Sequence, residues 1–202
     1  MSFLILGFLT GLSLILALGA QNIFVIEQGL KKQFIFIVCL ICALSDFLLI
    51  FLGIFLFQYF ENFFSQSIEL ILNILLFLFL INFIWKKVKL INKKISINQT
   101  QNKENLVNII FKTLGFTYLN PHVYSDTVFF LGNFSKSFLL GQKYLFGIGA
   151  SLSSILFFFS LGYFSKYLSG YVGSENLWKI INYSIILFMS LLSIYVFLNI
   201  IK

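Results

Sequence analysis

Charge is scarce in this sequence. Only 10% of its 202 residues are charged, and arginine is absent, so the 14 basic residues are all lysines. By contrast, 59% of the residues are hydrophobic and the mean hydropathy is +0.97. Soluble domains carry about 25% charged residues, so this composition excludes an ordinary soluble protein. The net charge of +7 bears on membrane orientation rather than on nucleic-acid binding, which we do not expect.

Cysteine and histidine are also scarce. The two cysteines, Cys39 and Cys42, lie within one apolar run, which does not indicate an extracytoplasmic disulfide framework. The single histidine, His122, leaves too few ligands to define a metal site. We therefore expect no bound metal and no cofactor.

Long apolar stretches make up most of the chain. Because a membrane-spanning helix needs about 20 apolar residues, there is room for six spans and for no separate soluble domain. We therefore predict an all-α, polytopic membrane protein in which residues 1–202 form a single transmembrane domain. The predicted spans are Phe3–Ile26, Phe34–Tyr59, Leu70–Trp85, Thr113–Phe134, Tyr144–Tyr163 and Ile180–Ile201.

One polar segment, residues 86–106, separates the third span from the fourth and contains six lysines. Cytoplasmic loops collect lysine, so the segment is predicted to be a cytoplasmic linker, with both termini outside. It divides the chain into halves 1–85 and 107–202, each with three predicted spans. Related halves of three spans each would have opposite orientations, as in the inverted repeats of secondary transporters.

Two acidic residues, Asp46 and Asp126, lie inside predicted spans, where each costs about 2.5 to 3.5 kcal/mol at the centre of a helix. Each follows a lysine, Lys32 or Lys112, by a similar stretch of helix of about 21 Å, so we predict that they lie at similar depth and share one cavity. A cationic ligand or a proton would be their partner. The alternative is that each acid pairs with a hydroxyl or amide group, or is protonated, and serves helix packing.

Helical spacing predicts which faces of the spans point inward. Asp46 shares a face with Cys39, Cys42 and Gly53, and His122 precedes Asp126 by one turn. His122 is a candidate for a proton relay or, alternatively, a buried neutral histidine. Two stripes of small residues favour close helix packing, although the stripe that contains serines also suits the lining of a water-filled path. They are Gly7 with Gly11, and Gly147 with Ser151 and Ser154.

The only proline, Pro121, follows Asn120 within the fourth predicted span. Asparagine favours the N-cap and proline the first position of a helix, so we predict that the span breaks here. A helix starting at Pro121 would direct free N–H groups into the membrane, which suits a carboxylate ligand, whereas the alternative is a simple kink. Gln21 and Asn22 mark the equivalent break in the first span; the alternative is that they lie at the cytoplasmic end of an intact helix.

Several motifs in both halves carry a resemblance to a known family. They comprise residues 11–15, 19–25, 28–29 and 45–46, and then 119–127, which read Leu-Asn-Pro-His-Val-Tyr-Ser-Asp-Thr, with 131–132. The chain resembles the LysE family of amino-acid exporters, particularly its lysine/arginine exporter branch. The resemblance covers nearly the whole chain except the linker and the last helix.

This resemblance implies a six-helix transporter of the inner membrane, not an enzyme, that exports arginine or lysine. It marks as functional the positions Gln21, Asn22, Asp46, Asn120, Pro121 and Asp126. One departure is Glu27, where the family has a basic residue, and it makes the cytoplasmic mouth less positive.

Energetics favour a coupled mechanism. Export of one positive charge against a negative-inside potential costs about 2.3 kcal/mol per 100 mV, so a passive carrier would import the substrate. Our hypothesis is proton antiport, in which Asp46 and Asp126 bind either a proton or the substrate cation. The substrate carboxylate would lie near Asn120 and Pro121, and the halves would rock to alternate access.

Two other functions stay open at this point. The Cys-x-x-Cys of Cys39 and Cys42 is typical of thiol oxidoreductases, although cysteines in an apolar helix usually pack as small hydrophobic residues. Export of a heavy-metal cation is the second alternative. The sequence separates neither arginine from lysine or an analogue, nor a monomer from a homo-oligomer.

Overall fold

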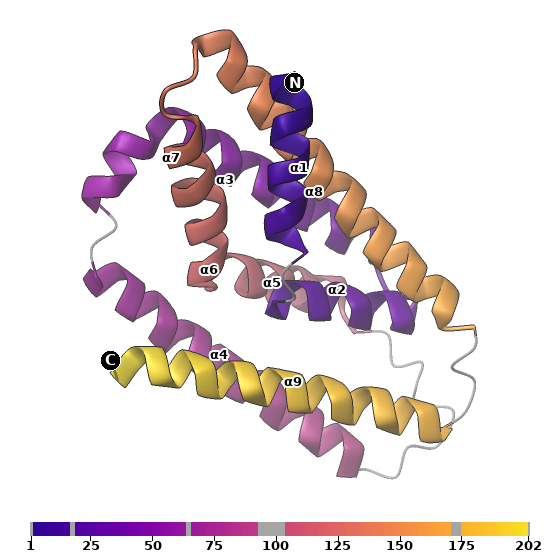
Figure 1. Ribbon diagram of the computed structural model, residues 1–202. Coiled ribbons are helices and arrows are strands. Elements are labelled where there is room, and N and C mark those ends of the chain that lie inside the picture. The colour runs from indigo at the N-terminus through magenta and orange to yellow at the C-terminus, as the bar shows by residue number, and fades with distance from the viewer. Residues whose placement is uncertain (1, 17–18, 64–65, 93–103, 171–174, 202) are drawn as a thin grey trace.

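The computed structural model describes residues 2–16, 19–63, 66–92, 104–170 and 175–201. All regular structure in these ranges is helical (Figure 1), as predicted. The order of elements is α1 (Phe3–Ile15), α2 (Ala20–Lys31), α3 (Ile35–Phe63), α4 (Gln66–Asn92), α5 (Leu106–Tyr118), α6 (Pro121–Tyr124), π-helical η2 (Ser125–Phe130), α7 (Leu131–Ser135), α8 (Leu140–Leu168) and α9 (Glu175–Ile201).

The first predicted span, Phe3–Ile26, is two helices. α1 ends at Ile15, and α2 begins at Ala20 with its axis bent by 83° from that of α1. The side chain of Asn22 donates a hydrogen bond of 3.1 Å from Nδ2 to the carbonyl of Ile15, which satisfies one acceptor at the open end of α1. The break therefore lies a few residues before Gln21, and α2 extends beyond Ile26 to Lys31.

The fourth predicted span, Thr113–Phe134, is also broken. α5 begins earlier than expected, at Leu106, and ends at Tyr118; the next helical turn starts at Pro121. Asn120 caps that turn, because its Oδ1 accepts a 3.1 Å hydrogen bond from the N–H of His122. The predicted break at Asn120 and Pro121 is confirmed.

The polar linker, residues 86–106, stays a prediction, and its first residues are helical. α4 continues through Lys86 and Lys89 to Asn92, since a lysine-rich stretch with no Gly or Pro can extend a helix. Of the rest of the linker, residues 93–103 lie outside the described part of the chain.

Three of the described helices are long and apolar enough to cross a membrane, and a fourth crossing is formed if α1 and α2 count as one bent span. The three comprise Ile35–Phe57 in α3, Leu140–Leu168 in α8 and Lys179–Leu198 in α9. The apolar parts of α4 and α5 are shorter, Asn73–Lys86 and Leu106–Tyr118. This is a polytopic membrane protein; the number of six spans stays a prediction.

Glycines set the closest helix contact, which is between α1 and α8 (Figure 1). A Cβ atom on Gly7 would lie 2.0 Å from the carbonyl oxygen of Phe146, and one on Gly149 would lie 2.0 Å from that of Leu4. Small residues allow such backbone approach in membranes. The packing role predicted for Gly7 is confirmed.

Three pairs of helices from the two halves agree in length. α1 and α5 have 13 residues each, α3 and α8 have 29, and α4 and α9 have 27. α3 packs against α8, and α4 lies alongside α9 (Figure 1). Such agreement is expected of two related halves, whose inverted relation stays a prediction.

Candidate functional site

A cavity of about 410 Å³ lies where the two broken segments meet. A Cβ atom on Gly19, at the start of α2, would lie 3.8 Å from Nδ2 of Asn120, so the two breaks face each other. The volume falls in the range of small-ligand sites. Polar side chains from α2, α3, α6, η2, α8 and α9 line it: Gln21, Asn22, Asp46, Asn120, His122, Asp126, Thr127, Ser153, Ser154 and Tyr195.

All but one of the residues predicted from the sequence to bind substrate line this cavity. The exception is Pro121, which is buried at the first position of α6 and fixes the start of that turn. Breaks in two helices that are distant in sequence thus bring Gln21 and Asn22 next to Asn120.

Asp46 lies on the inward face of α3 and is only 5% exposed. Its Oδ2 accepts a 2.7 Å hydrogen bond from Oγ of Ser154 on α8. One carboxylate oxygen of Asp46 therefore pairs with a hydroxyl group, as the alternative predicted. Asp46 also lines the cavity. Neither Asp46 nor Asp126 forms an ion pair with a described residue.

Asp126 is carried by the π-helical segment η2. Such segments occur frequently at functional sites, because the wider turn changes the direction of the side chains. η2 packs on α3 at Gly53, where a Cβ atom would lie 2.6 Å from Cα of Val128. This close approach holds the helix of Asp126 against the helix of Asp46.

An aromatic pair lies at one side of the cavity. The ring of His122 stacks on that of Tyr195, with centroids 5.6 Å apart and planes at 26°. Tyr195 comes from α9 and was missed in the sequence, where its span carried no motif. Ser154 was noted only as part of a stripe, for which packing was the favoured interpretation.

Both cysteines are buried on the same face of α3 as Asp46, and neither lines the cavity. The thiol of Cys39 donates a 3.2 Å hydrogen bond to the carbonyl of Phe158, and a Cβ atom on Gly162 would lie 2.6 Å from Sγ of Cys39. Cys39 thus packs against α8. No three His, Cys, Asp or Glu side chains in the described ranges are grouped closely enough to hold a metal ion.

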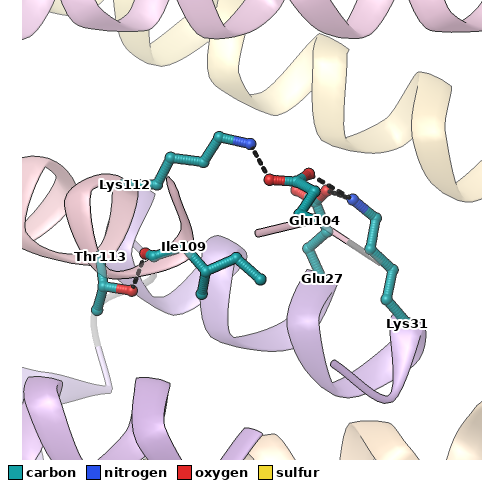
Figure 2. A network of polar contacts seen from close by, with 6 residues as sticks. All are labelled: Glu27, Lys31, Glu104, Ile109, Lys112 and Thr113. Carbon is teal, nitrogen blue, oxygen red and sulfur yellow. Dashed lines mark hydrogen bonds and ion pairs between the residues drawn. The ribbon is translucent and has the colours of Figure 1, made fainter. Parts of the chain in front are cut away.

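A second polar feature, the Glu104 network, was not foreseen (Figure 2). Lys31 on α2 forms ion pairs with Glu27, at 2.5 Å, and with Glu104, at 3.5 Å. Glu104 also accepts a hydrogen bond from Lys112 of α5. The network ties α2, in the first half, to the start of the second half. Glu27, at 3% side-chain exposure, is neutralised by Lys31 and tolerated in its buried position.

Comparison with known proteins identifies the family. The family described as "LysE type translocator" matches residues 12–199. The chain belongs to the LysE translocator family. The cavity around Asp46 and Asp126 is therefore the candidate transport site of a LysE translocator, in a multi-pass membrane protein.

Several relatives of this LysE translocator bear the name "Arginine exporter protein ArgO". The one from Pectobacterium carotovorum subsp. carotovorum (strain PC1) is 34% identical over 181 residues, which cover 88% of this chain and 87% of the relative. The one from Pectobacterium atrosepticum is 33% identical over 179 residues, with the same coverage. The protein of Salmonella typhimurium is 32% identical over 181 residues, covering 87% and 84%. No solved structure matches the chain.

Proposed function

We propose that this LysE translocator exports arginine across the cytoplasmic membrane, in exchange for protons and by alternating access. The observation that carries the proposal is the pair of carboxylates, Asp46 and Asp126, on one cavity, where no basic side chain of the described residues forms an ion pair with either. Acids inside membrane-spanning segments need a counter-charge, and this applies most to Asp46, which is buried. A cationic substrate supplies it, and the relatives named as arginine exporters point to arginine.

The two ends of arginine would meet different parts of the cavity. The guanidinium group binds between Asp46 and Asp126, since its planar fork of N–H donors matches carboxylates. The amino-acid carboxylate binds on the side of the broken helices, where Nε2 of Gln21 is buried and has no hydrogen-bond acceptor among the described residues. Asn22 and Asn120 add amide groups on the same wall.

Proton exchange would provide the driving force. Arginine carries a positive charge outward against the membrane potential, so export must be coupled to a favourable movement. In the proposed cycle Asp46 and Asp126 bind arginine when the cavity opens to the cytoplasm and protons when it opens outside. His122, one turn before Asp126, lies on the same wall and is the candidate relay.

The decisive experiment is efflux of radiolabelled arginine and lysine from loaded cells that express the protein. Asp46→Asn and Asp126→Asn keep the shape of each side chain and remove its charge, so both are expected to reduce export at least tenfold at matched membrane expression. Arginine is expected to leave faster than lysine, and an uncoupler that collapses the proton gradient should stop both.

Two results would contradict the proposal. If neither amino acid leaves faster than from control cells, the exporter assignment fails. If the uncoupler leaves arginine efflux unchanged, the proposal of proton antiport is rejected, whereas that of arginine export is retained. A Cys39→Ser variant serves as the matched control: it removes one thiol of the Cys-x-x-Cys pair at a residue that does not line the cavity, so export should be unchanged. Loss of export in this variant would instead support thiol chemistry.

A further inference from the structure

A larger cavity, of about 1030 Å³, lies in a groove between α4 and α5. It shares no lining residue with the cavity of Asp46 and Asp126, so it is a separate feature of the molecule. We refer to it as the α4/α5 groove. Its walls come from Phe79, Lys86 and Lys89 on α4 and from the stretch between Glu104 and Leu119.

The groove is polar at one end and apolar at the other. On α4 the lysines, Lys86 and Lys89, lie in the last two turns before the linker, and Lys112 lies midway along α5. Further from the linker the lining changes to Phe79 and Leu119. From residue 79 to residue 89 an α-helix rises about 15 Å. The groove therefore has the length and the polarity of a lipid head group followed by part of an acyl chain.

Trp85 marks the level of the lysine end. Its side chain is 66% exposed, and the Nζ atom of Lys89 lies 5.9 Å from the centre of its ring. Tryptophan and lysine gather where the membrane core meets the head groups. Trp85 and Lys89 thus suit the depth of lipid phosphates, and Phe79, further from the linker along α4, suits the hydrocarbon.

The charge at this end is not compensated by the protein. Both carboxylate oxygens of Glu104 are engaged by Lys31 and Lys112, whereas Lys86 and Lys89 form no ion pair within the described ranges. Residues 93–103 of the linker add three lysines and no acid, so they supply no counter-charge. The side chains of Lys86 and Lys89 are exposed and are free to bind an anion from outside the chain.

We propose that the α4/α5 groove binds an anionic phospholipid of the leaflet that faces the linker. The phosphate is held by Lys86, Lys89 and Lys112, and an acyl chain lies along Phe79. Basic pockets between membrane helices recognise anionic head groups in this way. The ring of Phe79 packs edge-to-face against that of Phe116, with ring centroids 4.8 Å apart, and this contact fixes the side chain at the apolar end of the groove.

The test uses the full chain purified in a mild detergent, with the thermal unfolding midpoint as the measured quantity. The protein is titrated with phosphatidylglycerol, with phosphatidylcholine of the same acyl chains, or with glycerol 3-phosphate. Phosphatidylglycerol is expected to raise the midpoint by roughly 3 °C or more, as for a ligand well above its Kd. The other two probes should raise it much less, because one lacks net charge and the other lacks chains.

Two variants of equal charge separate the groove from general electrostatics. Lys86→Gln with Lys89→Gln should abolish the extra shift caused by phosphatidylglycerol, whereas Lys136→Gln with Lys143→Gln, outside the groove, should keep it. An equal shift with phosphatidylcholine, or a full shift in the Lys86 and Lys89 variant, overturns the proposal. A full shift with glycerol 3-phosphate alone also overturns it, in favour of a free-phosphate site. None of these readings depends on arginine export.

Discussion

Ser154 on α8 donates a hydrogen bond of 2.7 Å to the carboxylate of Asp46 on α3, although 108 residues separate them in the chain. The bond joins a helix of the second half to a helix of the first, next to the cavity. Such a hydrogen bond stabilises a charged carboxylate that burial would otherwise disfavour. Ser154 therefore positions and stabilises the acid that we propose to bind the substrate cation.

Replacing Ser154 by alanine should weaken arginine export. Hydrogen bonds to charged groups contribute about 1.5 to 3 kcal/mol, so we expect the KM for arginine to rise at least about tenfold. Ser154→Thr retains the hydroxyl and should restore most of the activity. Ser151→Ala is the matched control, because Ser151 is equally buried on α8 and bonds only to the carbonyl of Gly147 in its own helix. Equal losses in the Ser151 and Ser154 variants would contradict this role.

Gly7 and Gly141 form a second matched pair, for stability. At Gly7 a Cβ atom would lie 2.0 Å from the carbonyl of Phe146, whereas at Gly141 nothing lies within 4 Å. Gly7→Ala must push α1 away from α8, at a cost of about 1 to 3 kcal/mol. Gly141→Ala should leave stability unchanged or raise it by up to about 1 kcal/mol. Thermal unfolding in one detergent measures both, and equal midpoints for the two variants would argue against the contact.

The Glu104 network should behave as one unit (Figure 2). Glu104 contacts both Lys31 and Lys112 with side chains that are about one quarter exposed. A partly exposed network of this kind contributes about 1 kcal/mol to stability. Glu104→Gln and Lys31→Gln should each lower the unfolding midpoint, and the double variant should lose less than their sum, because both remove the same contact. Additive losses would mean that the two residues act separately, and exposed Lys136→Gln is the control.

The sequence predicted the parts of the site that have local signals. Asn120 and Pro121 are adjacent in the sequence and together signal a helix start. Asp46 and Asp126 are conspicuous because an acid in an apolar span is costly. The break before Gln21 was placed too late. No proline marks this break. The hydrogen bond from Asn22 to the carbonyl of Ile15, at the end of α1, forms only because the chain bends by 83° between α1 and α2.

Other features depend on tertiary packing and could not be predicted. Ser154 and Tyr195 come from helices of ordinary apolar composition, and only the packing of α8 and α9 brings them to the cavity. The charge of Glu27 was interpreted as lowering the potential of the cytoplasmic mouth. Its contact with Lys31 is at helical i, i+4 spacing and was available in the sequence, whereas the contact of Lys31 with Glu104 joins the first half to the predicted linker.

Tyr195 offers a test of why arginine, rather than lysine, would be the preferred substrate. Its ring lines the cavity and stacks on His122, so an aromatic face borders the space beside Asp126. A guanidinium group stacks on aromatic faces, whereas the compact ammonium of lysine relies more on its carboxylate partners. Tyr195→Leu should therefore raise the KM for arginine about fivefold, equivalent to about 1 kcal/mol, and change that for lysine less. Tyr195→Phe keeps the ring and should retain the preference. Competition of unlabelled lysine against radiolabelled arginine measures the ratio directly, and an equal loss for both amino acids in Tyr195→Leu would assign the selectivity to the carboxylates alone.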